Sequence, residues 1–377
     1  MFLPEGSKDD IGQVVANRFK VFETFRQVAL SRNYTEISTP LVEYADTFTN
    51  DHVGMSLQNM LKWFNRDGAI EVLRPDWTTS ISRALTNHHM DQHKWAYHGS
   101  IFRQEIPGVE SRQVGIEIVQ LPALLGESEC LFLAYEFLNQ LQINDVIVEL
   151  GHTGIFEEWV TKLNLSEEQV DRLRNAMHDK RKDEVYEIAK QNGHEKEAEV
   201  LATLVDAYGP FEMIDEYFDR WEDQPKLISI LKHIKQLGMT LRNIGIEDLI
   251  IDLGRVKNLP YYTGTLFRGF LKQNGATCFS GGRYDKLYDR YQLVTSAVGI
   301  AFDVDILAEQ IRPEMKMEKI CIIANDEALA YAEKHRQSLT NKIVDIRYDI
   351  PKTNQYDEML IIMKKDDNKW EVTSYED

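Results

Sequence analysis

Hydrophobic and polar positions follow two periods along the first part of the chain. Residues 9–32 carry apolar side chains every three or four positions, which predicts an amphipathic helix. Residues 35–44 are rich in β-branched side chains and residues 69–75 alternate apolar and polar ones, so each segment predicts a strand. The same patterns predict, in chain order, a helix after Asp76, strands at 94–105 and 111–121, a helix at 127–141 and a strand at 145–152.

The pattern changes in residues 160–240, which are charged, rich in helix-forming residues and poor in β-branched ones. This composition predicts a helical insertion. Its charges are interpreted as solvated helix faces, with a partner-binding site as the alternative. Strand patterns return at 248–256, 261–271 and 276–282, and residues 314–377 carry one helix pattern among four strand patterns.

Strand pairs that are interrupted by helices are typical of an α+β fold. We therefore expect a core domain at 1–313, built on a mainly antiparallel sheet flanked by helices, with the helical insertion at about 160–240. A small C-terminal α/β domain is expected at 314–377. The chain has no GxGxxG or GxxxxGK[ST] motif, so neither a dinucleotide-binding fold nor a P-loop is supported.

The composition narrows the function classes. The chain has no run of about 18 apolar residues, and its first residues do not form a signal peptide, so no membrane association is expected. The three cysteines are far apart and form no CxxC motif, which indicates a reduced, cytoplasmic protein with small buried thiols. A net charge of −18 without a basic stripe disfavours nucleic acid as a partner.

Three histidines raise the question of a metal site. His89 and His93 are four residues apart on a predicted helix, beside His88, but no third ligand with suitable spacing is evident. We interpret these histidines as part of an exposed helix and expect no metal and no cofactor.

Three stretches of sequence contain side chains that could bind a ligand. In the first stretch, Asp76 and Thr78 lie where a strand meets a helix. Their oxygens could accept hydrogen bonds from the ammonium group of a ligand. The alternative is that Asp76 caps the helix by accepting hydrogen bonds from its free backbone N–H groups.

The second stretch is a predicted pair of strands. Arg103 and Glu105 are two residues apart and are expected on one face of a strand, while Gln113 and Glu117 share a face of the next strand. A guanidinium, an amide and carboxylates on one face are costly in a core unless they bind one another or a ligand. A structural salt-bridge network is the alternative to a binding site.

The third stretch contains two adjacent tyrosines. Tyr261 and Tyr262 lie in a predicted strand, so we expect their side chains on opposite sides, with at most one of them lining a given pocket. Lys257 could hold a carboxylate as a point charge. For Tyr261 the alternative is a core aromatic residue with a hydrogen-bonded hydroxyl.

A glycine pair follows in the stretch 279–287, which is typical of the wall of a small-ligand pocket. Gly281 and Gly282 permit close approach of a ligand or of another backbone segment. Arg283 and Asp285 are expected to pair with each other.

Seven blocks of sequence resemble, in the same order, the catalytic core of histidyl-tRNA synthetases, which have the class II aminoacyl-tRNA synthetase fold. The blocks are YTEISTPLVEYADTF, VLRPDWTTSISRA, FRQE, RQVGIE, YYTGTLF, SGGRYDKL and AVGIA. The resemblance covers about residues 3–307, and it implies that Asp76 and Thr78 meet the amino group of histidine, with Tyr261 near its imidazole. The residues that it implicates in histidine binding are Asp76, Thr78, Arg103, Gln113, Glu117, Lys257, Tyr261 and Tyr262.

Departures from that family concern ATP. Ile306 stands where the synthetases carry an arginine that binds the nucleotide phosphates, and the neighbouring Asp303 and Asp305 are expected to repel a triphosphate. The loop that grips ATP in the family is short here, with Arg112 as its one cation. Lys257 stands in place of an arginine that serves activation, and a point charge does not replace a planar guanidinium.

A chain that keeps the family's histidine-binding residues but lacks its ATP-binding residues resembles the ATP phosphoribosyltransferase regulatory subunits. This synthetase-like family does not charge tRNA. The resemblance implies a non-catalytic, allosteric subunit that activates a short-form catalytic subunit in histidine biosynthesis and takes part in feedback by L-histidine. It also implies homodimers that assemble with catalytic subunits into a hetero-octamer. Two alternatives stay open: a divergent histidyl-tRNA synthetase, and another synthetase-like protein that binds RNA or regulates a kinase.

Overall fold

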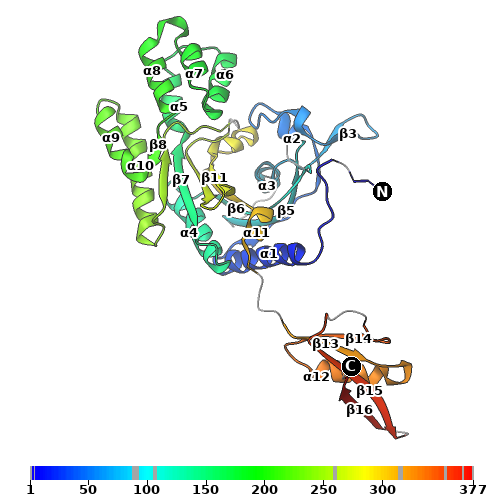
Figure 1. Cartoon of the computed structure of the whole chain (residues 1–377). Coiled ribbons are helices and arrows are strands. Elements are labelled where there is room, and N and C mark those ends of the chain that lie inside the picture. The colour runs from blue at the N-terminus through cyan, green and yellow to red at the C-terminus, as the bar shows by residue number, and fades with distance from the viewer. Residues whose placement is uncertain are drawn as a thin grey trace. The chain divides into compact units, whose positions relative to one another are not determined.

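The computed structural model in Figure 1 contains two compact units. It describes residues 2–3, 5–86, 93–104, 108–257, 261–312, 317–351, 355–366 and 369–375. The first unit is Met1–Ile311 and the second is Arg312–Asp377. The predicted domain boundary, between residues 313 and 314, falls outside the described ranges.

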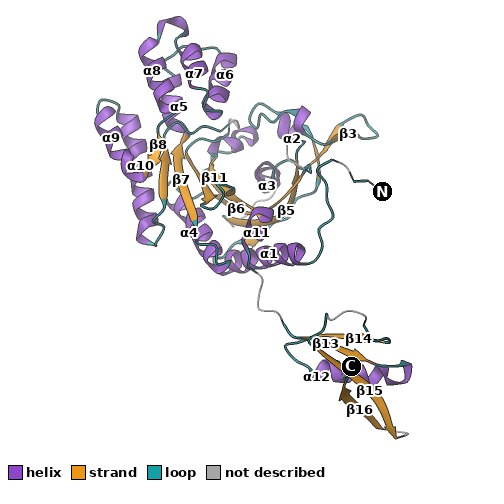
Figure 2. Cartoon of the chain, viewed as in Figure 1, coloured by secondary structure: helices purple, strands orange, loops and turns teal. Residues whose placement is uncertain are grey.

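A nine-stranded sheet forms the centre of the first unit (Figure 2). Its strands, in spatial order, are β1 (Thr35–Glu36), β5 (Lys94–Phe102), β6 (Glu110–Val119), β12 (Ala297–Asp303), β11 (Thr277–Arg283), β10 (Thr265–Leu271), β7 (Val146–His152), β9 (Leu249–Asp252) and β8 (Tyr208–Pro210). β1 with β5 and β7 with β9 are parallel pairs, and the other neighbours are antiparallel. The predicted α+β fold with a mainly antiparallel sheet is confirmed.

One face of this sheet, which we call the helix-covered face, packs against helices and holds the main core. These helices are α1 (Gln13–Ser31), α4 (Leu125–Gln140), α10 (Pro225–Asn243) and α11 (Val304–Gln310). The ring of Phe137 on α4 lies 5.4 Å from that of Phe25 on α1 and 5.0 Å from that of Phe302 on β12, between centroids. Val114 and Ile116 of β6 are buried in the same core.

Only one side of the helix predicted at 9–32 faces this core. Phe25 is buried, whereas Ile11, Val14 and Phe19 are exposed to solvent. Helix α1 begins at Gln13, so Ile11 lies outside it. The apolar spacing therefore predicted the helix correctly but overstated how much of it is covered.

The strand predicted at 35–44 is in fact two short strands in two different sheets. After β1 ends at Glu36, the chain enters a three-stranded sheet. Its strands, in spatial order, are β2 (Val42–Tyr44), β4 (Ile70–Leu73) and β3 (Lys62–Phe64). Pro40 lies between β1 and β2, and because proline lacks the N–H of a ladder bond it interrupts continuous pairing. Helix α2 (Asp46–Thr49) follows β2, and helix α3 (Trp77–Thr86) follows β4.

The segment 160–240 is largely helical. After α5 (Thr153–Val160) its helices are α6 (Glu167–His178), α7 (Lys182–Ala189), α8 (Glu195–Leu204), α9 (Ile214–Arg220) and α10. Helix α6 starts with a capping box, in which Ser166 and Gln169 satisfy each other's backbone N–H groups. The segment also contains β8, which extends the nine-stranded sheet beside β9. Short 3-10 helices in the chain are η1 (Leu57–Asn59), η2 (Gln191–Gly193), η3 (Phe211–Met213), η4 (Asp285–Tyr291) and η5 (Asp326–Ala328).

The second unit is a four-stranded sheet with one helix. Its elements are β13 (Lys319–Ile323), α12 (Leu329–Ser338), β14 (Ile343–Arg347), β15 (Glu358–Asp366) and β16 (Lys369–Ser374), and the strand order is β14-β13-β15-β16. Ile320 and Ile322 of β13 pack with Ala332 of α12 in its small core. This element order is the one that the sequence predicted for the C-terminal residues.

The cysteines are buried and unpaired, as their spacing predicted. Cys130 and Cys278 lie in the core of the first unit and Cys321 lies in the second. Burial raises the pKa of each thiol, for Cys278 to about 12. Among the described residues, no helix is both long and apolar enough to cross a membrane.

Candidate functional site

The polar candidates lie on the side of the nine-stranded sheet opposite the helix-covered face, and we call this side the site face. In β6, Gln113 and Glu117 share a face, as predicted, because residues two or four apart in a regular strand point the same way. On the neighbouring β12, Glu117 has Gly299 as its register partner, and a Cβ atom at Gly299 would collide with the Glu117 carboxyl. The glycine therefore lets this carboxyl lie across β12.

Glu117 is the most buried titratable group among the site candidates, with 1% of its surface exposed. Thr78 donates a hydrogen bond from its hydroxyl to Oε1 at 2.6 Å, and the Tyr284 hydroxyl donates to Oε2. No cation pairs with the carboxyl among the residues that the structure describes. Burial raises the pKa of Glu117 to about 8, although these two hydrogen bonds act in the opposite direction. A carboxyl held in this way is a ready acceptor for an N–H group.

The two carboxylate oxygens of Asp76 have different surroundings. Oδ2 accepts hydrogen bonds from the backbone N–H and the hydroxyl of Thr79, both at 2.7 Å, so Asp76 caps α3. Oδ1 lies 3.8 Å from Nη2 of Arg103. The capping interpretation is therefore correct, and it leaves Oδ1 facing a guanidinium group.

Arg103 does not lie in a strand, which corrects the prediction that it shares a strand face with Glu105. Strand β5 ends at Phe102, and Arg103 turns back so that its Nε donates to the backbone oxygen of Pro75 at 2.7 Å. Glu105 lies outside the described residues. Arg103 is thus fixed beside the start of α3 rather than along the sheet.

Gln113 occupies the site face with its amide unengaged. Its register partners are Gly99 on β5 and Asp303 on β12. Within the described part of the chain, its side chain makes no hydrogen bond. A side-chain amide offers both donors and an acceptor, so Gln113 remains free to bind a polar ligand.

The two tyrosines lie side by side, and the prediction that they face opposite sides of a strand is wrong. β10 begins only at Thr265, so Tyr261 and Tyr262 belong to the preceding loop. Their ring centroids are 4.9 Å apart and both rings line one hollow of about 460 Å³. Tyr261 is also only 2% exposed, so the core-aromatic interpretation describes its packing.

The electrostatic surroundings of Tyr261 connect the candidates. Burial raises the pKa of its hydroxyl, and the charges of Asp76, Arg103 and Glu117 act on it as well. The ring centroid of Tyr261 also lies 6.2 Å from that of Tyr284, whose hydroxyl donates to Glu117, so Tyr261 and Glu117 lie in one neighbourhood. The structure thus brings together side chains from a helix start, a strand end, a strand and a loop.

Lys257 is a cation without a carboxylate partner among the described residues. Its ammonium lies 5.4 Å from the ring centroid of Tyr262. Burial, together with the positive charges of Arg255, Arg268 and Arg103, lowers the pKa of Lys257 to about 8. The nearby carboxylate of Glu149 is bound by Arg268 through hydrogen bonds of 2.6 and 2.9 Å. A ligand anion would compensate this charge.

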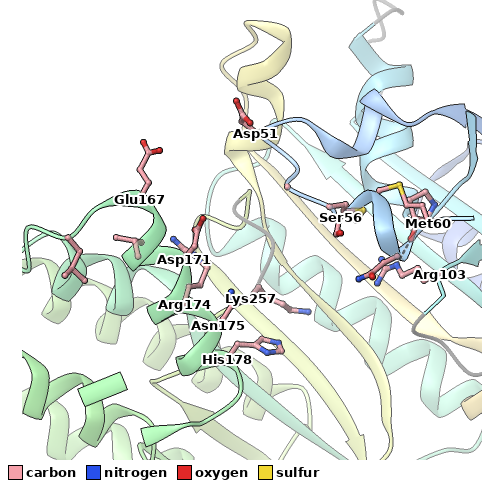
Figure 3. Close-up of a pocket in the computed structure, with 16 residues that line it drawn as sticks. Asp51, Ser56, Met60, Arg103, Glu167, Asp171, Arg174, Asn175, His178 and Lys257 are labelled. Carbon is pink, nitrogen blue, oxygen red and sulfur yellow. Dashed lines mark hydrogen bonds between the residues drawn. The ribbon is translucent and has the colours of Figure 1, made fainter. Parts of the chain in front are cut away.

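A cleft of about 1260 Å³ opens beside Arg103 and Lys257, as Figure 3 shows. One wall is the segment 51–60, and the other is α6 of the helical segment. Arg174 of α6 lines both this cleft and the hollow that contains the two tyrosines. Neither Glu117 nor Gln113 lines the cleft or the hollow.

The surroundings of Asp303 and Asp305 differ from the expectation that both carboxylates would face a bound triphosphate. Asp303 caps α11 by accepting from the backbone N–H of Ile306 at 3.0 Å. Asp305 pairs with Arg18 of α1 and, at 3.4 Å, with Arg112. Arg112 alternates with Gln113, so it points to the helix-covered face. Asp305 and Arg112 therefore bind each other away from the site face.

Two contributors were missed in the sequence. Tyr284 follows Arg283 in a stretch that was noticed for its glycines and for the Arg283–Asp285 pair, which the structure confirms at 3.2 Å. Its position next to that pair was the available signal for a role. Arg174 gave no signal, because its helix is charged throughout.

The metal interpretation of the histidines receives no support. His88 and His89 lie outside the described residues. Within the described ranges, no three His, Cys, Asp or Glu side chains are grouped to hold a metal ion.

Comparison with known proteins places this geometry in context. A family model for histidyl-tRNA synthetase matches residues 9–307. The chain is 31% identical over 313 residues to the ATP phosphoribosyltransferase regulatory subunit of Thermoanaerobacter pseudethanolicus, which is 81% of each chain. It is 28% identical over 381 residues to the subunit of the same name from Clostridium botulinum, which is 97% of this chain and 89% of that protein.

Solved structures show the same fold. An ATP phosphoribosyltransferase regulatory subunit/histidyl-tRNA synthetase from Bacillus halodurans C matches with a TM-score of 0.81 and 23% identity, over 96% of this chain and 97% of that chain. Histidyl-tRNA synthetase from Nostoc sp. PCC 7120 matches with a TM-score of 0.76 and 18% identity, over 96% and 91%. The predicted class II synthetase-like fold is confirmed.

Proposed function

We propose, from the premise that this chain belongs to the histidyl-tRNA synthetase family and within it to the ATP phosphoribosyltransferase regulatory subunits, that it is a non-catalytic subunit which activates ATP phosphoribosyltransferase and carries feedback control by histidine. The relatives of that name align with most of this chain and with most of their own length. This supports a shared role for the whole chain rather than for one fragment of it.

The proposal rests on two groups of the candidate site, a hydrogen-bond acceptor and a cation. Neither has an oppositely charged partner among the described residues. Glu117 is a buried carboxyl with only hydroxyl donors, and Lys257 is an ammonium without a carboxylate among the described residues. Histidine supplies what both lack, because its imidazole and ammonium donate hydrogen bonds and its carboxylate is an anion. We assign the imidazole to Glu117 and Tyr261, the ammonium to Asp76 and Thr78, and the carboxylate to Lys257. Arg103, Gln113 and Tyr262 complete the proposed pocket.

We do not propose that the site activates histidine with ATP. Ile306 packs against the hydrophobic core at the place that the resemblance assigns to a phosphate-binding arginine. Arg112 is paired with Asp305 and Glu110. A triphosphate on the site face would meet neither of these positions with a free positive charge.

We further propose that the protein is cytoplasmic and forms homodimers that assemble with short-form catalytic subunits into a hetero-octamer. Ile11, Val14 and Phe19 are apolar side chains exposed to solvent near this end of the chain, and we propose that they contribute to an interface. We propose no tRNA partner, which agrees with the net charge of −18.

Co-purification tests the partner. The full-length chain is expected to bind a purified short-form ATP phosphoribosyltransferase, to raise its turnover, and to make that turnover sensitive to histidine. If a catalytic subunit that is folded and active gains neither turnover nor histidine sensitivity, the proposed function is wrong.

A divergent histidyl-tRNA synthetase is the second candidate, because the whole fold matches such an enzyme with a TM-score of 0.76. Histidine-dependent exchange of pyrophosphate into ATP separates the two. We expect none above the level of a heat-inactivated sample, and robust exchange would establish the ligase instead.

Titration calorimetry tests the pocket itself. Replacing Glu117 by alanine removes the buried acceptor, so we expect histidine binding to weaken by about 1–3 kcal/mol. Glu23→Ala, on the exposed side of α1, is the matched control and is expected to bind like the unaltered protein. Equal affinities in all three proteins would refute the pocket assignment.

A further inference from the structure

We propose that Arg174, on α6 of the helical segment, is a further ligand-binding residue that supplies the second cation for the carboxylate of the bound amino acid. This inference rests on the proposed function above. Arg174 lines the cleft together with Arg103 and Lys257, and it also lines the hollow of Tyr261 and Tyr262. It therefore lies where the two spaces meet, next to the residues assigned to histidine.

The hydrogen-bonding state of Arg174 leaves capacity for a ligand. Its side chain is 16% exposed, and Nη1 donates to Oε1 of Glu157 at 2.8 Å. Its guanidinium lies 5.3 Å from the ring centroid of Phe156, which supports it from the side. Nε is buried and makes no hydrogen bond within the part of the chain that the structure describes. Nε itself is covered, but Nη2 also makes no hydrogen bond among the described residues, and a ligand oxygen in the cleft could accept from it.

Other arginines share the unsatisfied Nε but not the location. Arg74, Arg83 and Arg242 also have a buried Nε without a partner among the described residues. None of them lines the cleft or the hollow. The combination of an unused donor with a position between both spaces is what distinguishes Arg174 from them.

The chemistry of a carboxylate favours two cations of different shape. Lys257 is a compact point charge, whereas the planar guanidinium of Arg174 can present a pair of donors to both carboxylate oxygens. Both side chains line the cleft drawn in Figure 3. The acidic residues Asp51, Glu167 and Asp171 also line the cleft and would repel an anion that is not bound by a cation. A carboxylate is therefore favoured beside Lys257 and Arg174.

Such a contact would couple ligand occupancy to the helical segment. The loop that carries Lys257 is already tied to that segment. Lys180, two residues after α6, pairs with Asp252 at 2.8 Å, and Leu253 donates from its backbone to Ala207 at 2.9 Å. A bound carboxylate would add a direct link from Lys257 to α6. The ligand would then order α6 relative to the sheet, which gives the bound state a structural signature.

The test compares histidine with histamine, which keeps the imidazole and the amine but lacks the carboxylate. Calorimetry is done on the full-length protein, on Arg174→Gln and on the control Arg172→Gln, which removes an exposed charge from the same helix. We expect Arg174→Gln to bind histidine roughly tenfold or more weakly, while histamine binding and the control stay unchanged. A histidine-to-histamine ratio that is equal in all three proteins would overturn the inference.

Two further readouts keep this inference separable from the proposed function. If the unaltered protein binds no histidine, the assignment of the whole pocket is wrong. If histidine binds, and Lys257→Gln lowers its affinity while Arg174→Gln does not, only the role of Arg174 is wrong.

Hydrogen exchange provides the second measurement. Histidine is expected to slow exchange in α6 of the unaltered protein but not in Arg174→Gln. Glu157→Gln, which frees Nη1, is expected to bind histidine at least as tightly, and a marked loss of affinity would contradict the assignment.

Discussion

Glu117 and Glu127 are two glutamates with almost no solvent exposure, at 1% and 0%, in the same unit of the protein. Arg283 binds Glu127 through hydrogen bonds of 2.7 and 3.0 Å, and although burial alone would raise the pKa of Glu127, this partner lowers it. Glu117 has only hydroxyl donors, and burial raises its pKa to about 8. A buried carboxyl that has its cation holds the fold together, whereas one that lacks a cation is available to a ligand.

The same contrast distinguishes the charged groups on the two faces of the nine-stranded sheet. On the helix-covered side, Asp305 is satisfied by Arg18 and Arg112, so these groups have no need of a ligand. On the site face, Lys257 has three arginines near it and no paired carboxylate among the described residues. The position of a charge in the chain does not reveal which of these states it has, because the partner comes from a distant segment.

The largest expected effect comes from breaking the ion pair between Glu127 and Arg283. Among the described residues, Glu127→Gln leaves the buried Arg283 with Asp285, at 3.2 Å, as its one anionic partner, so we expect a loss of about 3–5 kcal/mol in the free energy of unfolding. Glu117→Gln is the matched substitution without a cation, and it is expected to cost no more than about 1 kcal/mol near pH 7. Urea unfolding of both variants measures the difference, and equal losses would remove the basis of the comparison.

The second prediction concerns pH. The folded pKa of Glu117, about 8, lies above the ordinary value of 4.5, so its contribution to stability is complete below pH 4.5 and is lost as the pH rises through about 8. Between pH 6 and pH 8, the unaltered protein should therefore lose roughly 2–3 kcal/mol of stability relative to Glu117→Gln. Glu127, with its lowered pKa, loses its contribution only as the solution becomes acidic.

The measurement is urea unfolding of the two proteins at several pH values. Taking the difference between them removes the contributions of His152 and His233, whose pKa values are lowered by burial in both proteins. Parallel curves over this pH range would contradict the raised pKa of Glu117.

The smallest expected effect sharpens the role of Lys257. Its pKa of about 8 means that the ammonium loses its charge as the pH rises from 7 to 9, so histidine affinity should fall by up to about tenfold. Lys257→Arg keeps its charge over this range, and its affinity should change less. Because both proteins meet the same ligand at each pH, identical pH profiles by calorimetry would show that residue 257 does not hold the carboxylate.

The sequence could predict features that depend on local periodicity. The spacing of Gln113 and Glu117 placed both on one face of β6 because a regular strand has a period of two. The same rule failed for Tyr261 and Tyr262, since they precede β10 and nothing in their spacing marks where the strand begins. Arg103 was misplaced for a related reason, because β5 ends one residue earlier.

Features that depend on tertiary contacts could not be read from the sequence. Arg174 stands in a charged helix, and only the fold brings that helix to the cleft. Tyr284 is one aromatic residue among many, and its bond to Glu117 joins positions far apart in the chain. Resemblance to a family suggested candidate site residues without their geometry, because it transfers positions and not contacts.

The burial of the cysteines has a practical consequence. Thiols that are inaccessible and hard to deprotonate react slowly with maleimides, so Cys130, Cys278 and Cys321 should give little background labelling in the native protein. A cysteine introduced at the exposed Asn175 of α6 would then be the preferred attachment point for a fluorescent dye. The labelling rate of the natural thiols would report on unfolding, because each thiol becomes reactive only when the core around it opens.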